Sequence, residues 1–199
     1  HITNIRDHYG VPVVVSINQF IADTQAEIDL VIEHCQALGI QVALSSHWAH
    51  GGAGATDLAH MVAAICESDE TSANTPHHSF VYEDSASLWE KIELVATTIY
   101  GASEITGSSK VRDRLRELTD SGYGHLPVCI AKTPYSFSTD PALKGAPSGH
   151  VMDIREIRLS VGAAFVVAVC GDVMTMPGLP KVPASQNIDV VDGQIVGLF

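Results

Sequence analysis

Two short apolar runs, each followed by an amphipathic segment, constrain the fold of this chain more than any other feature. VPVVVSIN (11–18) is an almost continuous β-branched run, which is typical of a strand buried on both faces of a parallel sheet. IQVALSS (40–46) is a second run of strand length. Segments 23–39 and 55–68 follow these runs with apolar residues at helical spacing. This β-α-β-α order predicts parallel strands joined by right-handed crossovers, and therefore an α/β fold.

Local sequence signals indicate where the first of these helices begins and ends. Asp23 or Thr24 can cap its first turn, and Glu27 stands at capping-box distance. Gly39 occupies the position at which a glycine commonly ends a helix. We therefore expect the helix to begin and end close to these residues.

The rest of the chain is predicted to be a mixture of helices, strands and long loops. Its elements are helices over 85–101 and 108–122, a buried strand over 126–133, a Pro/Gly/Ser loop over 134–150, one or two strands over 151–171, a segment over 174–184 whose prolines exclude a central strand or helix, and a hairpin with an Asp-Gly turn over 187–199.

Three segments follow from this pattern. Residues 1–67 form the βαβα parallel-sheet segment, and residues 68–125 form an acidic loop followed by helices. Residues 126–199 form a smaller C-terminal part of mixed β structure with long Pro/Gly loops. The predicted fold is therefore an α/β parallel-strand sheet with flanking helices, joined to a smaller C-terminal mixed α+β part.

Composition narrows the class of protein and its partners. The 199 residues are 46% hydrophobic and 17% charged, as in a globular protein, and the formal net charge of −12 disfavours nucleic acid or an anionic membrane as a partner. We find no apolar run near the ~20 residues of a membrane helix and no signal peptide, and we therefore expect a cytoplasmic location.

The start at His1 suggests a fragment of a longer protein. The four cysteines form no CxxC pair and are expected to be reduced and mostly buried.

The stretch SSHWAHGGAGATD (45–57) combines glycines, histidines and a tryptophan. It is not a Walker A loop, because no lysine follows Gly54, and it lacks the third glycine of a dinucleotide-binding motif. His47 and His50 have no further ligand nearby in the sequence, so no metal site is expected. We interpret the glycines as a flexible turn between a strand and a helix, whose amides could accept an anion.

Trp48 in this stretch is more informative than the glycines. It follows the second strand, and Phe20 follows the first. In an open parallel sheet, ligands bind beyond the carboxyl ends of the strands, and two aromatic rings there can enclose a flat ligand ring. The competing interpretation is that both rings only cover the core, as most aromatic side chains do.

Other polar residues leave alternatives open. Lys132 and Thr133, at the end of the strand predicted over 126–133, either neutralise a phosphate or carboxylate or are simply exposed to solvent. Arg155 and Arg158 are three residues apart, cannot share a face of one regular strand, and favour an ion-pair role for at least one of them. No catalytic base is identified. From its residues, the chain is a ligand-binding α/β domain, or alternatively a non-enzymatic binding or interaction module.

Several long strings of this sequence are specific enough to indicate a family. VPVVVSINQFIADTQAEIDL, ALSSHWAHGGAGATDLA, LPVCIAKTPYSFSTDP and REIRLSVGAAFVVAVCGDVMTMPGLPKVPA, together with the terminal NIDVVDGQIVGLF, resemble formate–tetrahydrofolate ligase. The resemblance covers essentially the whole chain, in order, and matches the C-terminal part of that enzyme. It implies that the parallel strands are a fragment of a P-loop-NTPase-like sheet.

The resemblance also implies an activity. The family uses ATP with Mg²⁺ to convert formate to formyl phosphate, from which N10 of tetrahydrofolate takes the formyl group. It further implies a full-length homo-oligomer that responds to a monovalent cation. Since the phosphate-binding loop and the catalytic residues belong to the N-terminal half of the family, this chain alone is expected to be inactive.

The resemblance assigns roles to particular residues of this chain. Phe20 and Trp48 match the aromatic pair that encloses the pterin ring. Leu44 and the turn glycines Gly51, Gly52 and Gly54 are expected to border that pocket. The loop carrying Lys132, Tyr135 and Ser136 is expected on the nucleotide side. Ile21 stands where the family often has proline, a departure in one wall of the pocket.

Overall fold

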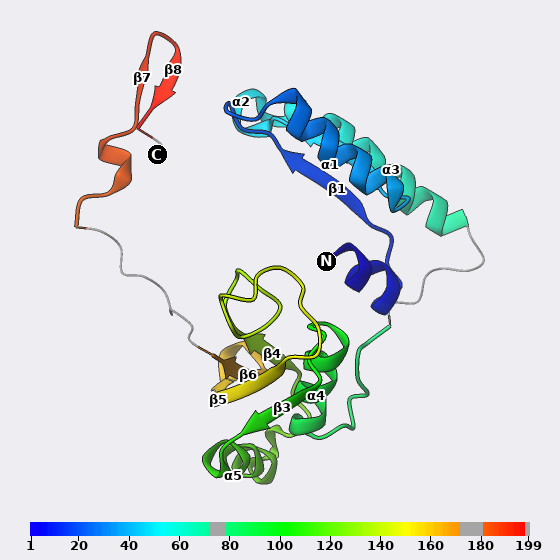
Figure 1. Ribbon diagram of the computed structural model, residues 1–199, viewed down its shortest axis with the longest axis vertical. Coiled ribbons are helices and arrows are strands. Elements are labelled where there is room, and N and C mark those ends of the chain that lie inside the picture. Colours follow the sequence, from blue (N-terminus) through cyan, green and yellow to red (C-terminus); the bar gives the residue numbers. More distant parts are fainter. Residues whose placement is uncertain (72–78, 172–180, 198–199) are drawn as a thin grey trace.

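The computed structural model describes residues 1–71, 79–171 and 181–197, and its strands form three separate sheets (Figure 1). The first is a two-stranded sheet of β1 and β2, the second has four strands in the order β3-β5-β6-β4, and the third is the hairpin β7–β8. Parallel strand pairs occur in the first two sheets. The fold is therefore of mixed α/β type, as the sequence predicts.

The first part of the structure is the predicted β-α-β-α unit. Strands β1 (Val14–Asn18) and β2 (Gln41–Ser45) pair in parallel. Helices α1 (Gln25–Ala37) and α3 (Thr56–Thr71) follow them. The prediction of parallel strands connected by a helix is confirmed.

The capping signals of α1 are also confirmed. The Thr24 side chain accepts a hydrogen bond from the Glu27 amide, and the Glu27 carboxylate accepts one from the Thr24 amide, which completes the capping box. The carboxylate's hydrogen bonds with Thr24 lower the pKa of Glu27. At the other end, Gly39 has a φ of +72°, the left-handed conformation that glycine adopts without strain.

The expectation that the first strand is buried on both faces is wrong, because no residue of β1 is fully buried and Ser16 and Asn18 are exposed. On β2, Ala43 and Ser45 are only 2% and 1% exposed, whereas Leu44 between them is 39% exposed. Figure 1 shows α1 and α3 side by side along one side of this sheet. Because side chains alternate between the two faces of a strand, only the face beneath the helices is buried.

The second part is a mixed sheet with helices α4 (Leu88–Thr98) and α5 (Ser109–Leu118). Its strands are β3 (Glu104–Gly107), β4 (Val128–Ala131), β5 (Val151–Ser160) and β6 (Phe165–Cys170). β3 pairs in parallel with β5, β4 pairs in parallel with β6, and the central strands β5 and β6 are antiparallel. The two predicted helices and the strands within 151–171 are confirmed, but the sequence did not predict β3, a short strand with little apolar alternation.

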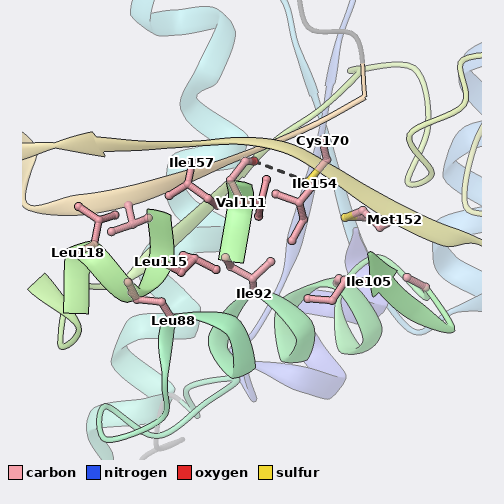
Figure 2. Packing of buried hydrophobic residues seen from close by; sticks show 14 of the residues in the cluster. Leu88, Ile92, Ile105, Val111, Leu115, Leu118, Met152, Ile154, Ile157 and Cys170 are labelled. Carbon is pink, nitrogen blue, oxygen red and sulfur yellow. Dashed lines mark hydrogen bonds between the residues drawn. The ribbon is translucent and has the colours of Figure 1, made fainter. Parts of the chain in front are cut away.

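Nearly all of the described hydrophobic core lies in this second part. Figure 2 shows the apolar side chains of α4 and α5 packed against those of β5 and of Cys170 on β6. The labelled members of this cluster are Leu88, Ile92, Ile105, Val111, Leu115, Leu118, Met152, Ile154, Ile157 and Cys170. This cluster, rather than the parallel unit, is the largest apolar core in the described residues.

Two details of this sheet differ from the sequence prediction. β4 was expected to be a buried strand, but it is an edge strand and its Cys129 is exposed. The register of β5 shifts between Ile154 and Glu156, and this bulge leaves both Ile154 and Ile157 buried. Arg155 and Arg158 therefore both lie on the exposed side, contrary to what a regular strand would give.

Polar and cysteine side chains add further corrections. Only Cys35 and Cys170 are buried, since Cys66 and Cys129 are exposed. The side chain of Lys91 on α4 is completely buried, and its ammonium donates to the carbonyls of His125 at 3.0 Å and Leu126 at 3.2 Å. These charge-assisted bonds satisfy a buried lysine that the sequence gave no reason to single out. An ion pair was expected for at least one of Arg155 and Arg158. It is confirmed for Arg158, whose Nη2 lies 2.7 Å from Oε2 of Glu156.

The hairpin is the third part. β7 (Asp189–Val191) and β8 (Gln194–Val196) are antiparallel, and Asp192 and Gly193 between them both have positive φ, as the predicted Asp-Gly turn requires. Residues 172–180, which hold most of the proline-rich segment predicted over 174–184, lie outside the described residues. Within the described residues, no helix has the length and apolar character of a membrane span.

The first helical turn, Asn4–His8, contacts both of the larger parts. The Arg6 guanidinium donates to the carbonyl of Leu38 at the end of α1, and the Asn4 side chain donates to that of Ile99 at the end of α4. The backbone also meets across this region, where the amide of Ser79 donates to the carbonyl of Tyr9.

Candidate functional site

The aromatic pair predicted from the sequence lies at one end of the β1–β2 sheet. Phe20 follows the last residue of β1 by two positions, and Trp48 belongs to a short helix, α2 (His47–His50), immediately after β2. Both side chains line a pocket of about 270 Å³. Parallel strands place their carboxyl ends at the same edge, which brings the two rings together.

Both rings remain accessible at this pocket. Phe20 is 48% exposed and Trp48 is 40% exposed, although each is a large apolar side chain. Neither ring stacks on the other among the described residues. Both rings therefore keep accessible surface at the pocket.

Hydrogen bonds fix the backbone around both rings. The indole nitrogen Nε1 of Trp48 donates to the carbonyl of Gln19 at 2.6 Å, and the amide of Gln19 donates to the carbonyl of Ser45 at 3.0 Å. The amide of Phe20 donates to Oδ2 of Asp23 at 2.7 Å. The turns that carry Phe20 and Trp48 are therefore tied to each other and to the end of β2.

The glycine run beside Trp48 is a turn that leads into the following helix, as the sequence predicts, and the turn is of the 3₁₀ type. Gly51–Ala55 forms a 3₁₀ turn that leads into α3. A Cβ on Gly54 would lie 2.6 Å from the carbonyl carbon of Ser46, and the Ser46 amide donates to the Gly54 carbonyl. Gly54 therefore lets the turn pack directly against the end of β2, while Gly51 supplies a φ of +57°.

The polar groups of the pocket come from the same two turns. Asp23 lines it on the Phe20 side, and Ser46 and His50 line it on the Trp48 side. Nδ1 of His50 lies 3.0 Å from Oγ of Ser46, so these two side chains bond to each other. Leu44, Gly51, Gly52 and Gly54, expected to border the pocket, are not among the residues that line it.

Sequence reasoning missed the contributions of Gln19 and Asp23 to this site. Asp23 was considered only as a helix cap, yet Thr24 caps α1 and Asp23 bonds the Phe20 amide instead. The available signal was its spacing, because an aspartate three residues after Phe20 can accept that amide in a tight turn.

The second predicted group of residues lies elsewhere, beside β4. The Lys132 ammonium donates to the carbonyls of Thr133 and Ser136 and lies 4.8 Å from the centre of the Tyr100 ring. Burial lowers the pKa of Lys132. Ser136 is buried and Tyr135 is exposed. Lys132 therefore binds carbonyls of its own segment. Residues 134–150 form a loop, as the sequence predicts.

His150, at the end of this loop, is a further residue that the sequence did not indicate. Both of its ring nitrogens are buried without a hydrogen-bond partner. Burial, and then the nearby charge of Lys132, lower the pKa of His150; the carbonyls of Pro147 and Phe137 act in the opposite direction, although neither forms a well-aligned hydrogen bond with the ring. The neutral imidazole is therefore favoured in the folded chain.

Two larger pockets lie elsewhere, and one of them, of about 390 Å³, is lined by Trp89, Leu88 and Leu115 together with polar and charged side chains of α5 and its C-terminal end. The other, of about 570 Å³ between α5 and β5, is lined mainly by charged side chains, among them Arg114 and Glu117, which form an ion pair with each other. The described residues contain no group of three or more His, Cys, Asp or Glu side chains that could hold a metal ion. The pocket of Phe20 and Trp48 differs from both in having two aromatic side chains in its lining.

Comparisons with known proteins agree on one family. The family model described as "Formate--tetrahydrofolate ligase" matches residues 1–199. Curated relatives with that name include those of Methylococcus capsulatus, 56% identical over 200 residues, and Methylibium petroleiphilum, 52% identical over 200 residues. The relative from Pelagibacter ubique is 50% identical over the same length.

Coverage in these comparisons is unequal. Each of the three alignments covers 100% of this chain but only 35% of the relative. The chain therefore spans about a third of the length of the curated relatives that it matches.

Proposed function

This chain belongs to the formate–tetrahydrofolate ligase family, and from that premise we propose that it supplies the pterin-binding wall of an ATP-dependent ligase. In the proposed reaction, a formate oxygen attacks the γ-phosphorus of ATP and ADP leaves. N10 of tetrahydrofolate then attacks the carbonyl carbon of formyl phosphate, the bond from that carbon to the phosphate oxygen breaks, and N10 releases its proton as phosphate leaves. The products are 10-formyltetrahydrofolate, ADP and phosphate.

The observation that carries this proposal is the accessible pair of Phe20 and Trp48 at one pocket. A pterin has apolar ring faces, and aromatic side chains offset above and below such a ring bind it by stacking. The bond from Trp48 to the Gln19 carbonyl holds the indole in place without the ligand. Such pre-organisation reduces the conformational entropy that binding would otherwise cost.

The same residues do not account for phosphoryl transfer. The chain contains no G-x-x-x-x-G-K-[ST] sequence, and no carboxylate cluster suited to Mg²⁺ occurs in the described ranges. We therefore assign the binding of ATP and formyl phosphate to the part of the protein that the relatives have beyond this chain. The proposal includes that the 199-residue chain is inactive alone, and ATP-dependent formation of 10-formyltetrahydrofolate by that chain would contradict it.

The test of the pterin wall is the Trp48→Ala variant of the full-length protein that contains this chain. We expect the KM for tetrahydrofolate to rise about 10-fold or more, since stacking on one aromatic face is worth roughly 1–3 kcal/mol. The KM for ATP should stay within about 2-fold, because we assign the binding of ATP to a part of the protein other than this pocket. Trp89→Phe is the matched control, since Trp89 packs against the core cluster under Arg112 and not at the pocket.

One contact favours a second candidate, a non-enzymatic binding module in which Trp48 only stabilises the turn. Its indole N–H is already used by the Gln19 carbonyl, as it would be in a purely structural tryptophan. The same variant separates the two functions. Loss of stability in Trp48→Ala with an unchanged KM for tetrahydrofolate would favour the second.

A further inference from the structure

We infer that Asp23 is a specificity-determining residue of the aromatic pocket, which binds the 2-amino-4-oxo edge of a pterin lying between Phe20 and Trp48. This inference rests on the proposed function and names the group that would orient the ring. Stacking alone leaves the ring free to rotate in its own plane or to turn over, because every flat heterocycle offers similar faces. A polar group at the ring edge is needed to fix one orientation.

The chemistry of that edge requires two acceptors side by side. The N3–H and the 2-amino group of a 4-oxo pterin are adjacent donors, and a carboxylate offers two acceptor oxygens at a matching spacing. Asp23 carries the only carboxylate among the residues that line the pocket. A neutral amide or hydroxyl could match only one of the two donors, since an amide places its own N–H₂ against the other.

The position of the Asp23 carboxylate is fixed by the same turn that holds Phe20. Its Oδ2 accepts the Phe20 amide at 2.7 Å, which leaves Oδ1 and the second lone pair of Oδ2 for a ligand. The carboxylate and the Phe20 ring therefore belong to one hydrogen-bonded turn, and both line the pocket.

The other polar groups of the pocket are engaged with each other. Ser46 and His50 form a mutual hydrogen bond, and the backbone of Gln19 is used by Trp48 and Ser45. The side-chain amide of Gln19 is neutral and presents a donor beside its acceptor. Asp23 is thus the group that matches two adjacent donors on a ligand.

The experiment compares two ligands on matched variants of the full-length protein that contains this chain. The ligands are tetrahydrofolate and its 2-desamino analogue, which keeps both rings and N3–H but lacks one donor. The variants are the wild type, Asp23→Asn, and Asp29→Asn as the control, since Asp29 is an exposed acid on α1 that bonds Gln25 away from the pocket. Asp23→Asn retains an oxygen that can accept the Phe20 amide.

For the wild type and Asp29→Asn, we expect tetrahydrofolate to bind about 10-fold or more tightly than the desamino analogue, the range of one charge-assisted hydrogen bond. For Asp23→Asn, the affinity for tetrahydrofolate should fall about 10- to 100-fold and the two ligands should differ by less than about 2-fold. The ratio between ligands is the decisive readout, because a merely structural role of Asp23 would weaken both ligands equally.

Equal weakening of both ligands, with the wild-type ratio kept, would overturn the inference while leaving the proposed function intact. Failure of the wild type to bind either ligand would instead contradict the proposed function itself. Retained discrimination and affinity in Asp23→Asn would assign the recognition of the ring edge to another residue.

Discussion

The two larger parts of this molecule are built from similar elements but differ in how much they bury. The four-stranded sheet and its helices α4 and α5 enclose most of the described core, whereas the β1–β2 unit buries few apolar side chains beneath α1 and α3. The candidate pocket lies in the less buried part. Binding sites with exposed aromatic walls need apolar surface that folding does not consume, and the β1–β2 unit retains such surface at Phe20 and Trp48.

The largest expected change is in the free energy of unfolding, and it tests the difference in burial between the two parts. Ile92 on α4 is 0% exposed and lies in the core cluster, so Ile92→Ala should lower the free energy of unfolding by about 3–4 kcal/mol through lost burial and a residual cavity. Leu30→Ala on α1 is the control, because Leu30 is 67% exposed and its truncation should change that free energy by less than about 0.5 kcal/mol. Urea unfolding of both variants measures this, and equal losses would refute the contrast.

A smaller effect compares two capping boxes of the same type, one in each part. Thr24 with Glu27 caps α1, and Ser87 with Glu90 caps α4. Thr24→Ala and Ser87→Ala should each cost about 1 kcal/mol, the usual value of a lost N-cap. Amide hydrogen exchange should show the loss near Thr24 as faster local opening of α1, and the loss near Ser87 as faster opening across the core. The same pattern in both parts would argue that they unfold as one unit.

The smallest effect concerns pH. Burial lowers the pKa of His150 below its ordinary 6.5, so the folded chain takes up this proton less readily than the unfolded chain. The wild type should therefore lose stability as the pH falls through about 6.5, whereas His150→Phe, which lacks the titrating group, should lose less. Thermal unfolding between about pH 5 and 8 measures the difference. Exposed His34→Gln is the control, and parallel pH profiles for wild type and His150→Phe would contradict the assignment.

Much of the secondary structure was predictable because its signals are local. The capping box of Thr24, the positive φ of Gly39 and the Asp192–Gly193 turn each depend on residues within a few positions of one another. The strand β3 was missed for the opposite reason. Its four residues carry little pattern of their own, and they form a strand because they pair with β5, nearly fifty positions away.

The candidate site was predictable in part. Phe20 and Trp48 follow consecutive parallel strands, and parallel pairing by itself brings the ends of such strands together. The sequence did not indicate that Trp48 donates to Gln19, that Asp23 bonds the Phe20 amide, or that Gly54 packs against Ser46. Each of these contacts depends on the path of a turn, which periodicity does not specify.

The sequence by itself determined the family, the order of most helices and strands, and the two aromatic residues at the strand ends, because motifs, helical periodicity and caps are properties of neighbouring residues. Only the tertiary structure decided that β1 and β2 are covered on one face, that a bulge turns Arg155 and Arg158 to the same side, and that the ring nitrogens of His150 are buried. Burial and side-chain pairing depend on what other segments bring to a residue, and that is fixed only when distant parts of the chain pack together.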